Sequence, residues 1–313
     1  MKEKTLSLII PCYNEQGNIG LMYERLRKVF KKLPYLYEII YVDNDSTDQS
    51  EKTFQLLAKK DKNVKVILMS RNFGSPQPSF LAGLEYATGD AAVFLHGDIQ
   101  DPPELIPQFI KKWKEGYDVV YGVRVHRKGY NFLMNFFYRF FYYLLHKLAY
   151  IKIPLNAGEF SLVDKKVIKE LLQIEEYDYY LRCLRAYVGF KQIGIPYERE
   201  ARSHGKSTES FWSGVWWAKT IIVNFSFKPL EWISKLAFVI VIFAFFSLMA
   251  FLIYYFFNPT SPRGIPTLFV LILFLGGIQL LSISVIAEYL AKIFLEVKRR
   301  PRYIIKKILN EKI

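Results

Sequence analysis

Two long uncharged runs near the C-terminus constrain this chain most. Residues 233–257 contain one charged side chain, Lys235, and residues 265–287 contain none. As helices, these runs would be about 35–38 Å long, enough to cross a hydrocarbon core of about 30 Å. The alternative is a helical hairpin buried in a soluble domain, but two uncharged runs of this length seldom fit one soluble core. We therefore expect two transmembrane helices, at 233–257 and 265–290.

The charges around these runs predict their orientation. The linker 258–264 contains a single cation, Arg263, whereas residues 219–235 and 291–313 are rich in lysine and arginine. The positive-inside rule then places both termini in the cytosol. A net charge of +14 could also indicate nucleic-acid binding. Next to apolar spans, however, the basic tail at 291–313 is better interpreted as a lipid-facing segment, so we expect membrane lipid and no nucleic acid as a partner.

The N-terminal part is expected to remain cytosolic. Its first apolar run, residues 6–10, is too short for a secretory signal. The two cysteines, Cys12 and Cys183, provide neither a disulfide framework nor a metal cluster, which is typical of a reducing compartment. The sequence thus predicts an integral protein of the inner (plasma) membrane with a cytosolic domain.

Residues 1–207 alternate short apolar runs with helical patterns, which is typical of an α/β domain with a doubly wound parallel sheet and right-handed crossovers. The expected strands are 5–10, 37–42, 64–68, 91–95 and 118–121, and the expected helices are 17–32, 50–60, 78–87 and 103–114. Residues 208–232 contain a tryptophan cluster (212, 216 and 217) and are expected to form an interfacial amphipathic segment. The aromatic helix expected at 130–150 is either interfacial or packed in a core.

Polar residues follow four of the expected strands, at 11–15, 43–48, 70–74 and 96–101. Open α/β sheets bind ligands at the carboxyl ends of their strands. The alternating Asp and Gln oxygens of residues 98–101 suit a hard divalent cation, Mg²⁺ or Mn²⁺, that also holds substrate phosphates. No G-x-G-x-x-G motif and no P-loop is present, so the pattern excludes a dinucleotide site and a kinase site.

In these motifs the chain resembles glycosyltransferase family 2, and within it the polyprenyl-phosphate glycosyltransferases, the group of dolichol-phosphate mannose synthase and bactoprenol glucosyltransferase. The matching motifs are Pro11-x-Tyr13-Asn14-Glu15, Val42-Asp43-x-x-Ser46-x-Asp48, Arg71-Asn72-x-Gly74, Asp98-x-Gln100-Asp101-Pro102-Pro103-Glu104 and Gly122-x-Arg124-x-x-Arg127. Gly158-Glu159-Phe160 and residues 202–207 match more weakly. The resemblance extends over essentially the whole chain. It implies a GT-A-like, Rossmann-like nucleotide-sugar transferase domain followed by two transmembrane helices.

The resemblance also implies roles for individual residues. The nucleotide would be bound by Pro11, Tyr13, Asn14, Glu15, Asp43, Asp45, Ser46 and Arg71. A divalent metal would be held by Asp98 and Gln100, with His96 as a further candidate ligand. The donor or acceptor phosphates would be bound by Arg124, Arg127, Arg202 and Ser207. Glu159 would lie near the reacting sugar, and the catalytic set would be Asp98, Arg124, Arg127 and Glu159.

The chain departs from the family pattern at five positions. His96 replaces the first Asp of the usual Asp-x-Asp, and it either ligates the metal or simply packs. Asn44-Asp45 replaces the usual Asp-Gly, which leaves open which of the two contacts the nucleotide. Ser161 replaces a common Arg, and Ser75 lies where a Lys is common.

The expected reaction is an inverting transfer of a sugar from a nucleotide-sugar, with a UDP-sugar favoured, to a polyprenyl phosphate, with undecaprenyl phosphate favoured. The product would serve cell-envelope glycan or lipid modification. One alternative is a processive polysaccharide synthase, whose Gln-x-x-Arg-Trp motif is missing from the comparable residues 180–185. The other is a catalytically degenerate scaffold that binds nucleotide-sugar without turnover. The apolar spans also allow a homo-oligomer.

Overall fold

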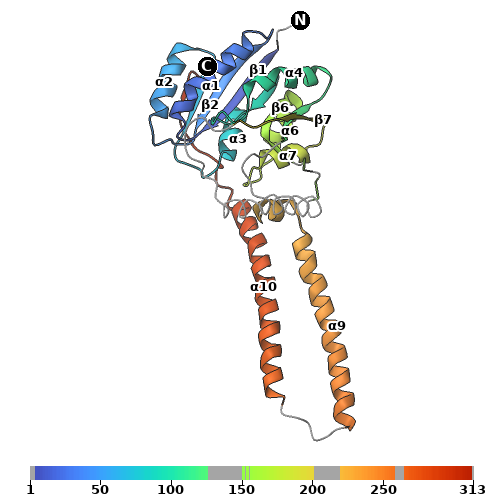
Figure 1. Ribbon diagram of the computed structural model, residues 1–313. Helices are drawn as coiled ribbons and strands as arrows, with labels where there is room; N and C mark the ends of the chain where they lie inside the picture. Colours follow the sequence, from blue (N-terminus) through green and yellow to red (C-terminus); the bar gives the residue numbers. More distant parts are fainter. Residues whose placement is uncertain are drawn as a thin grey trace. The chain divides into compact units, whose positions relative to one another are not determined.

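The computed structural model describes residues 4–125, 150–151, 153–154, 156–200, 219–257 and 264–311. The chain divides into two compact units. The first consists of residues 1–146, 151–209 and 300–313, and the second of residues 147–150 and 210–299. The first unit contains a mixed β-sheet with its helices, and the second contains two long apolar helices (Figure 1).

The first unit begins with the predicted alternation of strands and helices. Its elements are β1 (Thr5–Cys12), α1 (Gln16–Phe30), β2 (Leu36–Asp43), α2 (Ser50–Lys60), β3 (Val64–Met69), α3 (Gln77–Glu85), β4 (Ala91–Phe94), a 3-10 turn (Pro103–Leu105), α4 (Ile106–Lys114), β5 (Val119–Arg124), β6 (Ala157–Asp164), α6 (Lys165–Gln173), α7 (Leu181–Tyr187), β7 (Gln192–Tyr197) and β8 (Ile305–Leu309). All five predicted strands and all four predicted helices are present, with small shifts at their ends.

The sheet of the described residues has the order β7-β5-β6-β4-β1-β2-β3-β8. Strands β4, β1, β2 and β3 are parallel neighbours, as the alternation predicts. The sheet is not parallel throughout, because β6 runs antiparallel to both β4 and β5, and β8 runs antiparallel to β3. Strand β6 thus inserts between two strands of the expected parallel set, and the sheet is mixed.

Helices cover both faces of the sheet. Successive residues of β1 point to opposite faces, so each face presents apolar side chains that a helix can bury. Leu8 and Ile10 belong to a buried cluster that also contains residues of α1, α2 and α4. Ile9 points to the other face, where α3 packs closely. A Cβ at Gly83 of α3 would lie only 2.3 Å from Cγ2 of Ile9, so this approach requires glycine.

The C-terminal segment differs from the basic tail expected at 291–313. Helix α10 continues to Lys298, and Ile305–Leu309 then form the edge strand β8. In β8, Lys306 and Lys307 are exposed, while Ile305 and Ile308 pack against a buried cluster of the sheet. Lysines are typical of edge strands, where they discourage pairing with other chains. The positive charge of this segment therefore reflects its edge position as well as any contact with lipid.

The second unit contains α9 (Lys228–Phe257) and α10 (Ile265–Lys298), which lie side by side (Figure 1). Both are long and apolar enough to cross a membrane, and none of the residues in their most apolar windows is buried. Large apolar side chains such as Phe243 and Leu273 are about 70% exposed. Within the described residues, neither helix is therefore buried as a hairpin in a soluble core would be. The aromatic helix expected at 130–150 and the tryptophan cluster fall at positions that lie almost entirely outside the described residues.

Candidate functional site

The four polar loops predicted from the sequence lie at one edge of the sheet. Strands β4, β1, β2 and β3 are adjacent and parallel, so their carboxyl ends meet at this edge. Residues 96–101, 11–15, 43–48 and 70–74 follow these strands in that spatial order. The sequence-based expectation of a shared polar edge is confirmed.

Asn14 joins the loops after β1 and β2. Its backbone has a positive φ of 55°, a conformation that Asn tolerates better than most residues. Its backbone N–H donates to Oγ of Ser46 at 2.9 Å, and its side-chain oxygen accepts from the N–H of Thr47 at 2.8 Å. Asn14 therefore organises the loop around the candidate nucleotide residues.

Asp43 is the last residue of β2 and is almost fully buried. Its Oδ1 accepts a hydrogen bond from the Ser46 hydroxyl at 2.5 Å. Burial raises the pKa of this carboxyl, and the two hydrogen bonds from Ser46 only partly offset that effect. A carboxylate held in this way is suited to accept hydrogen bonds from a ribose or a base, as strand-end carboxylates do in dinucleotide folds.

Asn44 connects the β2 loop to the β3 loop. Its side-chain nitrogen donates to Oδ1 of Asn72 at 3.2 Å and to the Ser75 carbonyl at 3.4 Å, and its side-chain oxygen accepts from the N–H of Phe73 at 3.0 Å. Asp45 is half-buried and has a positive φ of 61°. Since Asn44 is committed to these contacts, Asp45 is the better candidate for contacting a ligand.

The remaining nucleotide candidates differ in exposure. Tyr13 is 39% exposed, whereas Pro11 and Glu15 are buried. The Glu15 carboxylate accepts a hydrogen bond from the side chain of Asn18. Arg71 is exposed and its guanidinium lies 4.1 Å from the ring centre of Phe73. Tyr13 and Arg71 are thus available to a ligand at the surface of this edge.

The loop after β4 is closely packed and has an unusual backbone conformation. A Cβ at Gly97 would lie 2.6 Å from Sγ of Cys12, so this position requires glycine. Ile99 has a positive φ of 61°, which is unusual for a β-branched residue. Strain of this kind costs about 1–3 kcal/mol and persists only where the surroundings hold it. Ile99 is 3% exposed, and its burial provides that restraint.

Asp98 faces an arginine that follows β7. Its Oδ2 lies 3.7 Å from Nη2 of Arg199, and its Oδ1 accepts from the backbone N–H of Gln100 at 3.2 Å. The side-chain nitrogen of Gln100 donates to the Glu200 carbonyl at 3.3 Å. The segment after β7 is thereby held against the Asp98 loop.

Asp101, Tyr197 and Arg124 form a buried group beside this loop. The Tyr197 hydroxyl donates to Oδ1 of Asp101 at 2.5 Å, and Arg124 Nη2 lies 3.9 Å from the same oxygen. Burial would lower the pKa of Arg124, but Asp101, Tyr197 and Glu159 outweigh it and raise the pKa above its ordinary value. Arg124 therefore provides a permanent positive charge at this position.

Glu159 of β6 lies between two polar partners. Its Oε2 is 3.5 Å from Nε2 of His96, and its Oε1 accepts from Nε2 of Gln77 at 3.3 Å. Burial favours the neutral acid, but His96, Arg182 and Arg124 outweigh it and lower the pKa of Glu159 well below its usual range. For His96, burial lowers the pKa, yet the contact with Glu159 and nearby acidic groups produce a net increase. The geometry therefore favours a carboxylate paired with an imidazolium.

Arg185 lies behind Glu159 and is fully buried. Its Nη1 and Nη2 donate to the backbone carbonyls of Glu159 and Gly158 at 3.4 and 3.2 Å. Burial lowers the pKa of Arg185 to about 10. This buried cation fixes the backbone from which Glu159 projects.

A divalent metal fits this edge only as a cation shared with substrate phosphates. Among the described residues, no group of three or more His, Cys, Asp or Glu side chains could hold a metal. His96 directs Nε2 to Glu159, so it acts as a partner of that carboxylate in this structure. Asp98 nevertheless offers carboxylate oxygens, and Oδ2 of Asp101 is buried without a hydrogen-bond partner in the described part of the chain. Mg²⁺ is typically bound by one or two carboxylates together with substrate phosphates, which matches this donor set.

Three candidate residues, Arg127, Arg202 and Ser207, lie outside the described residues. Conversely, the sequence reasoning did not identify Gln77, Arg185 or Arg199 as members of the site. Arg199 lies three residues before the segment 202–207, and this proximity was its one local signal. Gln77 and Arg185 had none, because only the tertiary fold brings them to Glu159.

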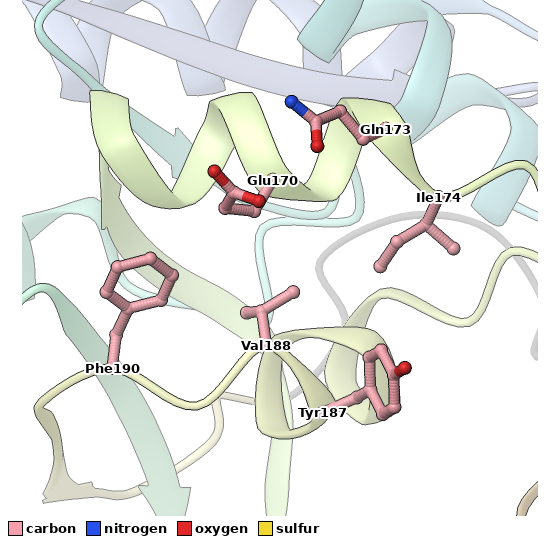
Figure 2. A pocket seen from close by; sticks show the side chains of 6 residues that line it. All are labelled: Glu170, Gln173, Ile174, Tyr187, Val188 and Phe190. Carbon is pink, nitrogen blue, oxygen red and sulfur yellow. The ribbon is translucent and has the colours of Figure 1, made fainter.

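A pocket of about 540 Å³ lies elsewhere in the first unit, between α6 and the end of α7 (Figure 2). It is lined by Glu170, Gln173, Ile174, Tyr187, Val188 and Phe190. None of the candidate site residues lines it, so this pocket is separate from the polar edge.

Comparisons with known proteins identify the family to which the chain is similar. Residues 7–172 match the family model described as glycosyl transferase family 2. An uncharacterized glycosyltransferase of Synechocystis sp. is 37% identical over 301 residues, covering 96% of this chain and 94% of that protein. The bactoprenol glucosyl transferase of Shigella phage SfII is 36% identical over 304 residues, covering 96% and 97%.

Solved structures are more distant. Mannosyl-3-phosphoglycerate synthase from Rubrobacter xylanophilus is 17% identical, with a TM-score of 0.46, and the match covers 74% of this chain and 75% of that one. S. aureus TarS 1–349 in complex with UDP-GlcNAc is also 17% identical, with a TM-score of 0.42 and coverage of 71% and 67%.

Proposed function

The chain belongs to glycosyl transferase family 2 and is a GT-A-like glycosyltransferase, and we propose that it transfers a sugar from a nucleotide-sugar, preferably a UDP-sugar, to a polyprenyl phosphate. Undecaprenyl phosphate is the favoured acceptor, and the reaction takes place at the cytosolic face of the membrane. The observation that carries this proposal is the likeness to bactoprenol glucosyl transferases, which spans 96% of the chain and includes both apolar helices.

The membrane location follows from α9 and α10. Their exposed apolar side chains favour a hydrocarbon environment. The linker between them contains one basic residue, Arg263, whereas several basic residues lie at the opposite ends of the two helices. By the positive-inside rule, both termini and the glycosyltransferase domain are then cytosolic. A membrane-bound enzyme gains access to an acceptor that is itself a lipid.

The donor nucleotide is assigned to the loops after β1, β2 and β3. Asp43 and Asp45 offer oxygen acceptors for ribose or base, and Tyr13 offers an exposed ring. Pro11, Asn14, Glu15 and Ser46 shape this region, and Arg71 is positioned at its rim. This assignment follows the general rule that open α/β sheets bind ligands beyond the carboxyl ends of their strands.

The diphosphate is assigned to the loop after β4. We propose Asp98, with Gln100, as the ligands of Mg²⁺ or Mn²⁺, and His96 as the partner of Glu159 rather than a ligand. When bound, the metal would neutralise charge on the diphosphate leaving group. Arg124 supplies a second positive charge from the protein, and Arg127, Arg202 and Ser207 are assigned to the phosphates by family resemblance alone.

The chemistry requires little proton transfer. A phosphate monoester has a second pKa near 6 and is mostly a dianion at pH 7. Its oxygen forms the bond to the anomeric carbon while the bond from that carbon to the diphosphate breaks, which gives inversion and releases the nucleoside diphosphate. The main obstacle is repulsion between two anions, which Arg124 reduces. Glu159, whose pKa is lowered, is a weak base and is assigned to orienting the sugar.

The test is turnover by the full-length protein in detergent. Radiolabelled nucleotide-sugars are incubated with undecaprenyl phosphate and Mg²⁺ or Mn²⁺, and the lipid fraction is separated by thin-layer chromatography. We expect one labelled lipid carrying a single sugar, and loss of that product in Asp98→Asn, with Lys306→Ala as a surface control. A polymeric product would indicate a processive synthase. Nucleotide binding without lipid product from any donor would indicate a scaffold and overturn the proposal.

A further inference from the structure

Arg199 lies opposite Asp98 at the polar edge. It follows β7 by two residues, and its Nη2 is 3.7 Å from Oδ2 of Asp98. The Asp98 side chain is 16% exposed and that of Arg199 is 28% exposed, so both retain access to a ligand. The arginine therefore sits where the proposed metal and diphosphate would meet.

The position of Arg199 is fixed by contacts on both sides of it. On one side, the Tyr197 hydroxyl donates to Asp101 at 2.5 Å. On the other, the backbone N–H of Glu200 donates to the Gln100 carbonyl at 3.0 Å, and Arg25 binds the Glu200 carboxylate at 2.9 and 3.0 Å. The segment is thus anchored to the loop that carries Asp98, and Arg199 is held next to that carboxylate.

The guanidinium of Arg199 has N–H donors available for further hydrogen bonds. A guanidinium has five N–H donors. The contact with Asp98 is an ion pair at 3.7 Å, and Nε is buried without a hydrogen-bond partner within the described residues. Because a guanidinium matches the geometry of two phosphate oxygens, a diphosphate would satisfy these donors better than the present contact does.

We propose that Arg199 and the divalent cation compete for Asp98, and that Arg199 binds the donor diphosphate once the cation occupies Asp98. Without the cation, Arg199 neutralises Asp98. Cation binding releases the guanidinium, which then contacts the phosphates from the side of β7. This inference rests on the proposed function, since it takes Asp98 as a metal ligand.

The inference predicts opposite changes in two affinities when the arginine is removed. A partly exposed ion pair is worth about 0.2–1 kcal/mol, so Arg199→Gln should tighten Mn²⁺ binding in the absence of donor by about 1.5- to 5-fold. Loss of a charge-assisted phosphate contact of about 1.5–3 kcal/mol should weaken UDP binding at saturating Mn²⁺ by about 10-fold or more. Arg199→Lys keeps the charge but loses the bidentate geometry. It should leave Mn²⁺ binding near that of the parent protein while UDP binding weakens.

The experiment measures Mn²⁺ binding by electron paramagnetic resonance and UDP binding by calorimetry, on the full-length protein in detergent. Lys112→Gln, at a partly exposed position of α4, controls for the loss of one positive charge. Unchanged Mn²⁺ affinity in Arg199→Gln, or a weakening of both ligands, would overturn the inference. If Asp98→Asn still abolishes Mn²⁺ binding and the parent protein still makes lipid product, the proposed function stands without this role for Arg199.

Discussion

Nε2 of His96 lies 3.5 Å from Oε2 of Glu159. Glu159 lies in β6, and His96 follows the neighbouring strand β4. The His96 ring also packs edge-on against Phe80. We propose that the contact between His96 and Glu159 accounts for the departure from Asp-x-Asp at position 96. An aspartate there would face the buried Glu159 carboxylate, whereas an imidazole provides it with a partner.

His96→Asp tests this explanation. If His96 is the partner of Glu159, two carboxylates in a buried pair will repel, and we expect a loss of about 1–3 kcal/mol in the free energy of unfolding together with reduced transfer. Thermal unfolding and Mn²⁺ binding are both measured, with His96→Gln as the neutral control. Tighter Mn²⁺ binding at unchanged thermal stability would show instead that position 96 is a metal-ligand position.

Gly158→Ala tests the role of Arg124 without removing it. A Cβ at position 158 would lie 2.8 Å from Nη2 of Arg124, so the guanidinium must move. Because the obstructing atom is the end of a flexible side chain, we expect a small change in thermal stability. Displacing a phosphate-binding group by about 1 Å can reduce turnover on the order of 100-fold. Gly20→Ala, which meets no atom within 4 Å, is the control, and equal activity in the two variants would remove Arg124 from the proposed site.

Substitutions of Asn44 and Asp45 should affect different properties: the Asn44 substitution should lower thermal stability, and the Asp45 substitution should weaken UDP binding. Asn44→Ala removes three hydrogen-bonding contacts between the β2 and β3 loops. This substitution should lower the free energy of unfolding by about 1–3 kcal/mol, because buried polar groups lose their partners. Asp45→Gly, which accepts the positive φ of 61° without strain, should leave thermal stability nearly unchanged and weaken UDP binding. Calorimetry and thermal unfolding on both variants check this, and the reverse pattern would assign the nucleotide contact to Asn44.

The sequence predicts the strands whose apolar character is local. Strands β1 to β4 are mostly apolar, and their parallel pairing places the candidate residues of four loops at one edge. Strand β6 was not identified because Glu159 and Ser161 interrupt its apolar pattern, although both are buried in the fold. The sequence favours a basic tail over strand β8 because the strand is short, contains Lys306 and Lys307, and lies in a segment rich in basic residues.

The missed site residues have a common cause. Gln77 and Arg199 are distant in sequence from Glu159 and Asp98, and neither occurs in a motif that the chain shares visibly with the family. Their contacts depend on how β6 and β7 are placed in the sheet, which the sequence pattern does not specify. The metal role of His96 was left open for the same reason, since its partner Glu159 is 63 residues away.

The contacts of Arg25 should be sensitive to acid. Arg25 Nε donates to Glu104 at 2.9 Å, and its Nη atoms bind Glu200. Partial burial raises the pKa of Glu104, but the hydrogen bonds and charge of Arg25 outweigh it, and the net pKa is lowered from 4.5. A lowered pKa stabilises the folded state above pH 4.5, and this stabilisation is lost as the pH falls through the folded-state value. Arg25→Gln should therefore lower the free energy of unfolding by about 0.5–1 kcal/mol at pH 7 and by progressively less below pH 4.5, as measured by urea unfolding. A difference that is independent of pH would contradict this.

The C-terminal strand should be required for stability of the first unit. Strand β8 covers the edge of β3, the Ile304 carbonyl accepts from the N–H of Ser70 at 2.9 Å, and Asn310 donates to the Val64 carbonyl at 2.9 Å. Asn310 also has a positive φ of 56°, which Asn tolerates and Ala does not. Asn310→Ala should lower the free energy of unfolding by about 1–3 kcal/mol, whereas Lys306→Ala on the same strand should stay within about 0.5 kcal/mol of the parent protein.

A chain ending at residue 300 should aggregate through the uncovered edge of β3, visible by size-exclusion chromatography in detergent. Because β3 leads into the loop that contains Arg71, UDP binding should weaken as well. Unaltered thermal unfolding and elution of the shortened chain would show that β8 is dispensable for this fold.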